Sequence, residues 1–283
     1  MTTYVGLDSK WTEEFDSGRE YIALRNWSYL PKFNIDGSVD NCYQSFALNG
    51  NTAFDLSANG HNLNLNATSN PPTFVFGSSN GYGSWDFDGV NDRTQISPTV
   101  TNVANNFTYI IWALPDDTIT LYTEGNNNTS GTNGQRWLIG PSLVGSSGGT
   151  ESGMGISMGT NGIQVCEHSG GYLPILTKYD NGNSTNGGKI STTKFNQVAV
   201  VTSNANTLGG NPAHTIYING ELASNYGVES AKSTVHVAGG PLIGGGSYGD
   251  FSGKIGVVKL FTSALSEDQV RNEFKAYRHR YFQ

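Results

Sequence analysis

The chain has 283 residues, a formal net charge of −7 and a pI near 5.1, and its 16 lysines and arginines form no basic stripe. We therefore expect no nucleic-acid partner. No window approaches the roughly 18 uninterrupted apolar residues of a membrane-spanning helix, so we also expect no membrane span. With 37 glycines and only 14% charged residues, the composition favours short strands and tight turns around one main core.

Residues 1–40 are expected to form an N-terminal arm. This segment carries Trp11, Phe15 and Trp27 among charged residues, and rings of this size must be buried against something. We therefore expect a docking segment that contacts the main domain or a neighbouring subunit. The first residues lack the basic start and apolar stretch of an export signal, which predicts synthesis in a cytoplasm.

Residues 41–283 alternate strand-length runs with turn signals. Asn–Gly pairs such as Asn161–Gly162 and Asn219–Gly220 separate several runs, as tight hairpins require. Recurrence at this spacing predicts a β-sandwich or barrel. The expected strands are residues 42–48, 84–89, 107–114, 135–140, 155–159, 162–168, 195–202, 214–220, 233–239 and 253–261.

One helix is expected at the C-terminal end. Ser266 can cap its first turn, with Gln269 as the reciprocal partner of a capping box. Val270 and Phe274 are four residues apart and therefore share the inner face of a short helix.

The segment from Gly249 to Phe282 resembles the closing strand and helix of concanavalin A-like domains of the laminin-G type. The matching residues are Phe251, Gly253, Ile255, Val258, Leu260, Phe261, Ala264, Leu265 and Ser266. Four upstream segments resemble motifs of the same family in the same order, namely DLSANGH, SWDFDGVND, FTYIIWALP and TIYINGELA. The resemblance implies an all-β fold, a two-sheet antiparallel jelly-roll sandwich with a short C-terminal helix.

Sugar binding on such a sandwich needs an aromatic platform and polar side chains that fix hydroxyl groups. Trp112 lies in a strongly apolar strand and is expected in the core. The candidate ligand-binding residues adjoin glycine-rich loops, and each has interface formation or local hydrogen bonding as its alternative explanation. They are Asn133, Trp137, Glu167, His168, Tyr172 and Tyr248.

Calcium is the candidate cofactor. Aspartates in loops rich in backbone carbonyls offer the oxygen ligands that hard cations prefer, and many members of the superfamily bind calcium. Turn capping by the same side chains is the alternative, because no contiguous ligand loop is present. The candidate ligands are Asp55, Asp88, Asp92 and Asp250.

We expect no enzymatic activity, because no nucleophile elbow, zinc-binding helix or phosphate-binding loop is present. A retaining glycanase would need two carboxylates about 5 Å apart. Glu14, Asp16 and Glu20 have a compatible spacing, but the intervening polar residues break the strand that would hold them, and we interpret the segment as a solvated charged arm.

A glycan-binding domain without an export signal fits a virion protein, which assembles in the host cytoplasm and meets glycans after lysis. The domain resembles those found in bacteriophage structural proteins. We therefore expect a capsid decoration, head-fibre or tail-fibre component that forms homo-oligomers. Its arm would bind other virion proteins, and its sandwich would bind polysaccharide. The alternatives are a carbohydrate-binding module of a bacterial surface or secreted protein, and a glycanase.

Overall fold

A computed structural model describes most of the chain beyond the first thirty residues. The acidic residues Glu14, Asp16 and Glu20 and the strand expected at 42–48 lie outside the described ranges. These ranges are 31–37, 52–57, 59–65, 70–76, 83–146, 148–182, 188–207, 209–230, 232–237 and 241–281.

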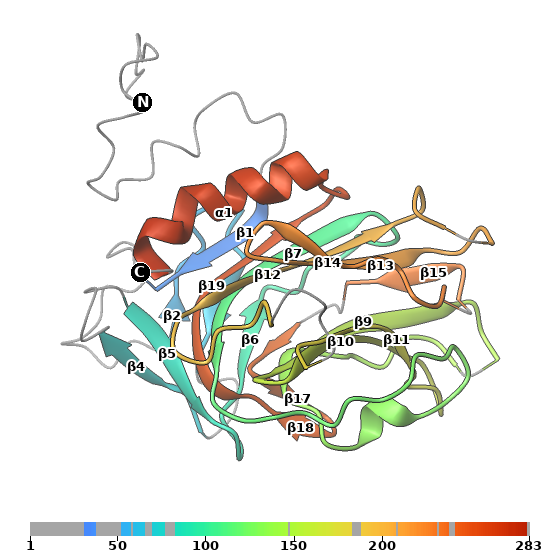
Figure 1. Ribbon diagram of the computed structural model, residues 1–283, viewed down its shortest axis with the longest axis horizontal. Coiled ribbons are helices and arrows are strands. Elements are labelled where there is room, and N and C mark those ends of the chain that lie inside the picture. The colour runs from blue at the N-terminus through green and yellow to red at the C-terminus, as the bar shows by residue number, and fades with distance from the viewer. Residues whose placement is uncertain are drawn as a thin grey trace, which may run out of the picture.

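Two large sheets face each other as a sandwich (Figure 1). Within the described ranges the first sheet has eight strands: β1 (Pro31–Asp36), β4 (Thr73–Phe76), β5 (Gly83–Asp88), β7 (Phe107–Pro115), β12 (Asn196–Ser203), β13 (Ala213–Ile218), β14 (Glu221–Ser224) and β19 (Ser252–Phe261). Their order is β14-β13-β12-β7-β19-β5-β4, and β1 pairs with the second half of β19.

The second sheet has nine strands in the same ranges: β2 (Thr52–Ala53), β3 (Asn62–Asn64), β6 (Thr94–Ser97), β8 (Trp137–Gly140), β9 (Glu151–Gly159), β10 (Gly162–His168), β11 (Ile175–Asp180), β15 (Thr234–His236) and β16 (Leu242–Ile243). Their order is β11-β10-β9-β8-β16-β6-β3-β2, and β15 pairs with the start of β9. A small separate hairpin joins β17 (Gly245–Gly246) to β18 (Gly249–Asp250). The other described elements are a 3-10 turn at Ser130–Thr132 and the helix α1 (Glu267–Tyr281).

The main core fills the space between the sheets. Ile111 and Val200 from the first sheet and Ile156 and Val165 from the second all lie in one buried cluster. Burial of these aliphatic side chains removes their apolar surface from water, which is the main favourable contribution to folding.

The helix α1 covers the outer face of the first sheet (Figure 1). Trp112 of β7 stacks on Phe274 and Tyr281 of the helix, with ring centroids 5.7 and 5.6 Å apart. Strands β7 and β12 are therefore buried on both faces, which explains the nearly continuous apolar sequence of β7. The expected position of Trp112 in the core is confirmed.

The capping box at the start of α1 is present. The Ser266 amide donates to Gln269 Oε1 at 2.8 Å, and the Gln269 amide donates to Ser266 Oγ at 3.3 Å. At the other end, Arg280 forms a buried ion pair with Asp36 of β1 at 3.0 Å. The helix end therefore fixes β1, which belongs to the sandwich although it precedes the predicted boundary between residues 40 and 41.

Loops lie directly on the outer face of the second sheet. A Cβ atom at Gly153 would come within 2.3 Å of the Ser142 carbonyl oxygen, and one at Gly155 within 2.7 Å of Pro141. Only glycine permits this approach, so the alternating glycines of β9 are explained by the loop that packs on the strand.

Candidate ligand-binding site

The hairpin formed by β17 and β18 presents the most exposed aromatic ring of the described residues. Its turn consists of Ser247 and Tyr248, and Tyr248 is 50% exposed. Tyr248 has a φ of +75°, a left-handed conformation that is unfavourable for a bulky side chain. Strained residues of this kind cluster at functional sites, where the surrounding structure holds them in place.

Three contacts fix the hairpin to β8. The indole Nε1 of Trp137 donates to the Ser247 carbonyl oxygen at 3.0 Å. A Cβ atom at Gly140 would come within 2.3 Å of the Gly245 carbonyl oxygen, so the backbones pass at close range. The Gly244 amide also donates to the Leu138 carbonyl oxygen at 3.1 Å. These contacts hold the turn that carries Tyr248 against β8.

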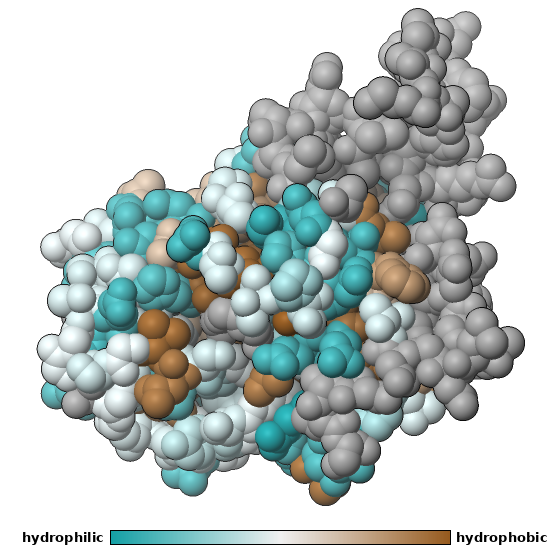
Figure 2. Space-filling view, turned by 180° about the vertical axis from the view of Figure 1, so that it is seen from behind, coloured by the Kyte–Doolittle hydropathy of each residue, from teal (hydrophilic) through white to brown (hydrophobic). Residues whose placement is uncertain are grey.

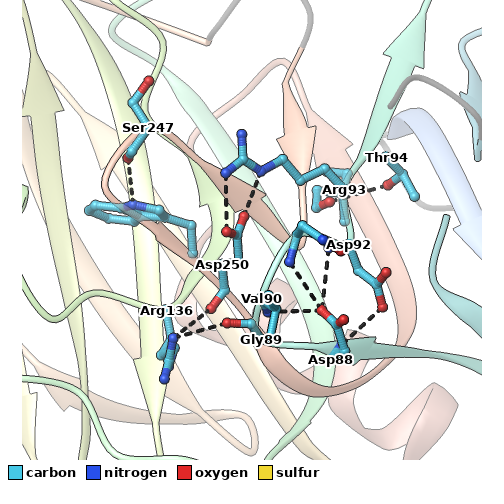
Figure 3. Close-up of polar contacts among 12 residues, drawn as sticks. Asp88, Gly89, Val90, Asp92, Arg93, Thr94, Arg136, Ser247 and Asp250 are labelled. Atoms are coloured by element: carbon cyan, nitrogen blue, oxygen red, sulfur yellow. Dashed lines mark hydrogen bonds and ion pairs between the residues drawn. The ribbon is translucent and has the colours of Figure 1, made fainter. Parts of the chain in front are cut away.

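An ion pair ties the hairpin to Arg93, the residue directly before β6 (Figure 3). Arg93 donates to both carboxylate oxygens of Asp250, from Nε to Oδ1 at 2.5 Å and from Nη2 to Oδ2 at 3.1 Å. Hydrogen bonding to this carboxylate raises the pKa of Arg93 above its ordinary value, although partial burial acts in the opposite direction. Two parallel bonds fix both the position and the orientation of β18.

Arg136 adds a second tie (Figure 3). Its Nη1 donates to the carbonyl oxygens of Gly89 and Asp250, both at 3.3 Å. Its Nη2 pairs with Asp117 Oδ2 at 3.2 Å. One guanidinium group therefore joins the turn after β5, the hairpin and the loop after β7.

Three of the four aspartates expected to bind calcium are occupied by turn formation, and the fourth, Asp250, pairs with Arg93. Asp88 accepts the amides of Val90 and Asn91 at 2.8 and 3.1 Å, and the Val90 amide in particular lowers the pKa of Asp88. Asp92 accepts the Asp88 amide at 2.9 Å. Burial, together with nearby aspartates, raises the pKa of Asp92.

Asp55 lies in a different turn. It accepts the backbone amides of Asn34, Ser57 and His61 at 2.8 to 3.0 Å, and Gly60 in the same turn has a positive φ of 76°. Across the ranges that the structure describes, no three histidine, cysteine or acidic side chains are grouped so that they could hold a metal ion. The predicted ligands Asp55, Asp88, Asp92 and Asp250 thus do not form one calcium site. Turn capping accounts for the first three, and Asp250 is paired with Arg93.

Tyr248 and His168 form the exposed part of the site. Their rings meet edge to face, with centroids 6.1 Å apart and an interplanar angle of 71°. His168 Nδ1 lies 3.2 Å from the Pro141 carbonyl oxygen. Because a carbonyl oxygen only accepts, this contact places the proton on Nδ1 and makes Nε2 the acceptor of the neutral ring. The pair therefore offers an aromatic edge beside a hydrogen-bond acceptor.

Three other predicted ligand contacts belong to the interior. Trp137 and Glu167 have no exposed surface, and Tyr172 is 6% exposed with Lys232 Nζ 4.9 Å from its ring centre. A ring without an exposed face cannot stack on a sugar, and Trp137 instead holds the hairpin through its bond to Ser247. Asn133 is exposed and its amide donates to Thr132 Oγ1 at 3.2 Å.

Glu167 lies in a buried polar network between the two sheets. It accepts from Ser152 Oγ at 2.9 Å and from the Ser230 hydroxyl, and it contacts His214 Nε2 at 2.9 Å. His214 Nδ1 lies 2.9 Å from Thr202 Oγ1. A hydroxyl, an imidazole and a carboxylate in this order can activate a nucleophile, but Thr202 has no exposed surface that a substrate could reach. The network instead connects the sheets.

Sequence reasoning did not single out Arg93 and Arg136. Each is an isolated arginine in its own segment, and their partners Asp250 and Gly89 are far away in the chain. Neither local pattern nor spacing signals such contacts.

Comparison with known proteins agrees with this architecture. Residues 145–271 match the family model of the concanavalin A-like lectin/glucanases superfamily, which confirms the resemblance seen in the closing segment. No curated protein sequence matches the chain.

Several solved binding domains share the fold. The binding domain of Paraclostridial Mosquitocidal Protein 1 superposes with a TM-score of 0.56 and 13% identity over 88% of this chain and 52% of that one. The receptor binding domain of botulinum neurotoxin type G superposes with a TM-score of 0.55 and 14% identity, over 87% of this chain and 51% of that one. The binding domain of botulinum neurotoxin DC in complex with SialylT superposes with a TM-score of 0.52 and 12% identity, over 87% of this chain and 51% of that one. The chain spans about half the length of these structures, and at these identities the likeness shows the fold.

Proposed function

We propose that this concanavalin A-like sandwich is a non-catalytic, lectin-like domain that binds carbohydrate on a cell surface through Tyr248 and its surroundings. The observation that carries the proposal is the strained, half-exposed conformation of Tyr248 on a hairpin held by Trp137, Arg93 and Arg136. A rigidly held aromatic ring is a suitable platform for the C–H face of a sugar.

The surface seen from behind the view of Figure 1 is largely polar. Figure 2 shows hydrophilic and neutral residues over much of this face, with the hydrophobic ones in small separate groups. Among the described residues, the exposed large hydrophobic side chains are scattered over five positions: Phe54, Val90, Leu143, Leu222 and Tyr248. The part of the chain that the structure describes contains no helix long and apolar enough to cross a membrane.

The binding test compares the parent chain with Tyr248→Ala and Tyr248→Phe on a glycan array and on bacterial cells. Loss of one stacked ring should weaken binding about tenfold or more, while Phe should retain most of it. Equal binding by Tyr248→Ala would exclude this ring as the platform. A hydrolysis assay of the parent chain on the bound glycans addresses the glycanase alternative, because product release would contradict a purely binding role.

The biological setting we propose is a bacteriophage particle, with the domain carried as a capsid decoration, head-fibre or tail-fibre component. The segment before β1 would attach it to other virion proteins. Because β1 is part of the sandwich, the informative deletion ends before Pro31. Removing residues 1–30 should abolish incorporation into particles while the circular dichroism spectrum keeps its β character.

Unchanged incorporation after this deletion would reject attachment through the segment. The alternative is a carbohydrate-binding module of a bacterial surface or secreted protein. It predicts that the chain binds glycan but does not associate with phage particles. Capsid or tail genes beside the coding sequence would favour the virion.

A further inference from the structure

We infer that the Tyr248 site takes a neutral glycan and discriminates against sugars that carry carboxylates. This inference rests on the proposed function, since it names the ligand class of the same site. It follows from the charges around the hairpin and from the proton on His168.

The positive charges next to the hairpin are engaged in the fold. Arg93 makes two bonds to Asp250, and Arg136 pairs with Asp117 while it also donates to two backbone carbonyls. A lectin site that selects a carboxylate normally offers it a bidentate guanidinium or a similar donor. Recruiting Arg93 for that purpose would leave Asp250, only 8% exposed, without its partner.

Acidic side chains outnumber basic ones in this neighbourhood. The two arginines that hold the hairpin face four aspartates, and the Asp86–Lys254 pair at 3.6 Å adds no net charge. The field at the loop tips is therefore negative and repels an approaching anion at low salt. The residues concerned are Arg93, Arg136, Asp88, Asp92, Asp117 and Asp250.

The exposed hydrogen-bonding groups also suit hydroxyls. In the neutral imidazole of His168, Nε2 is an acceptor when Nδ1 donates to Pro141, so it pairs with a ligand group that carries a proton. A sugar hydroxyl supplies one, whereas an ionised carboxylate has none to donate. Ser247 is exposed beside Tyr248 and can both donate and accept.

The experiment uses the full chain and one polysaccharide in two charge states, namely polygalacturonate and its methyl ester. Neutral dextran, galactan and mannan complete the panel. Affinity electrophoresis at low and high salt measures binding. We expect at least one neutral polysaccharide to bind with an affinity that changes less than about twofold with salt, and polygalacturonate to bind at least about tenfold more weakly at low salt.

Two variants with the same charge change separate a local from a general effect. Asp117→Asn removes a negative charge beside Arg136, and Glu221→Gln removes one on β14, the edge strand of the first sheet. The ratio of acidic-glycan to neutral-glycan affinity should rise in Asp117→Asn and stay unchanged in Glu221→Gln. Tight, salt-sensitive binding of polygalacturonate by the parent chain would overturn the inference but leave the proposed function. Failure to bind any glycan would overturn both.

Discussion

Arg93 and Asp250 are 157 positions apart in the chain, yet they form a two-bond ion pair that joins the start of β6 to the hairpin carrying Tyr248. The carboxylate is almost buried, and the guanidinium group is about one-third exposed. The pair therefore fixes the hairpin more firmly than a fully solvated ion pair would.

Replacing Arg93 by alanine should lower the free energy of unfolding by about 1–3 kcal/mol, because it leaves a poorly solvated carboxylate without its charged donor. Hydrogen exchange at Ser247–Asp250 should accelerate, and glycan affinity should fall with it. Lys254→Ala is the control, since its contact with Asp86 at 3.6 Å is looser and both side chains are about one-third exposed. A loss in Lys254→Ala as large as that in Arg93→Ala would argue against a specific role for the pair.

Tyr248→Gly should separate stability from binding. Glycine adopts a φ of +75° without strain, so the free energy of unfolding should rise by about 1 kcal/mol in urea titrations. Glycan binding should be lost with the ring. Gly249 also has a positive φ, and a side chain there would clash with the Gln135 carbonyl, so Gly249→Ala should be destabilising instead. A destabilised Tyr248→Gly would show that the conformation carries no strain.

The buried pair of Lys259 and Glu273 joins β19 to the helix α1, with nitrogen and oxygen 3.1 Å apart. Burial disfavours the charged lysine, but Glu273 and Tyr277 outweigh it and raise the pKa of Lys259 well above its ordinary value. Glu273→Gln should lower the free energy of unfolding by about 3–5 kcal/mol, because an unpaired charge remains buried. The double variant Lys259→Met with Glu273→Leu should recover most of this loss in thermal denaturation, and a double variant no more stable than the single one would contradict it.

Asp88 predicts a pH dependence of stability. Its folded-state pKa is lower than the ordinary 3.8, so the ionised side chain stabilises the fold above that pH, and the contribution is lost as the pH falls through the lowered pKa. The parent chain should therefore be more stable than Asp88→Asn at neutral pH, and the difference should vanish in acid. Urea titrations over this range measure it.

Asp92→Asn supplies the comparison of opposite sign. Burial raises the pKa of Asp92 above 3.8, so its ionisation opposes folding as the pH rises. Relative to the parent, Asp92→Asn should gain stability from acid to neutral pH. If the stability difference from the parent changed with pH in the same direction for Asp88→Asn and Asp92→Asn, the opposite roles assigned to the two carboxylates would be contradicted.

Several features of the fold followed from local sequence. Ser266 and Gln269 are close enough in the chain to form the capping box whatever the rest of the molecule does, and both bonds are present. Asn219 and Gly220 have the positive φ values of 54° and 77° that a two-residue hairpin needs. Such signals act over a few residues, which is why they could be predicted.

The residues of the candidate site likewise separate into those that local sequence predicted and those whose position depends on the tertiary structure. The sequence alone determined the concanavalin A-like sandwich, the closing strand and helix, and Tyr248 and His168 as candidate ligand contacts. Only the tertiary structure decided that Trp137, Glu167 and Tyr172 are interior. Exposure depends on which distant loops cover a strand, and an ion pair such as Arg93–Asp250 depends on where two remote segments meet. Neither quantity is encoded in the spacing of neighbouring residues, because both arise when the sheets and loops pack together.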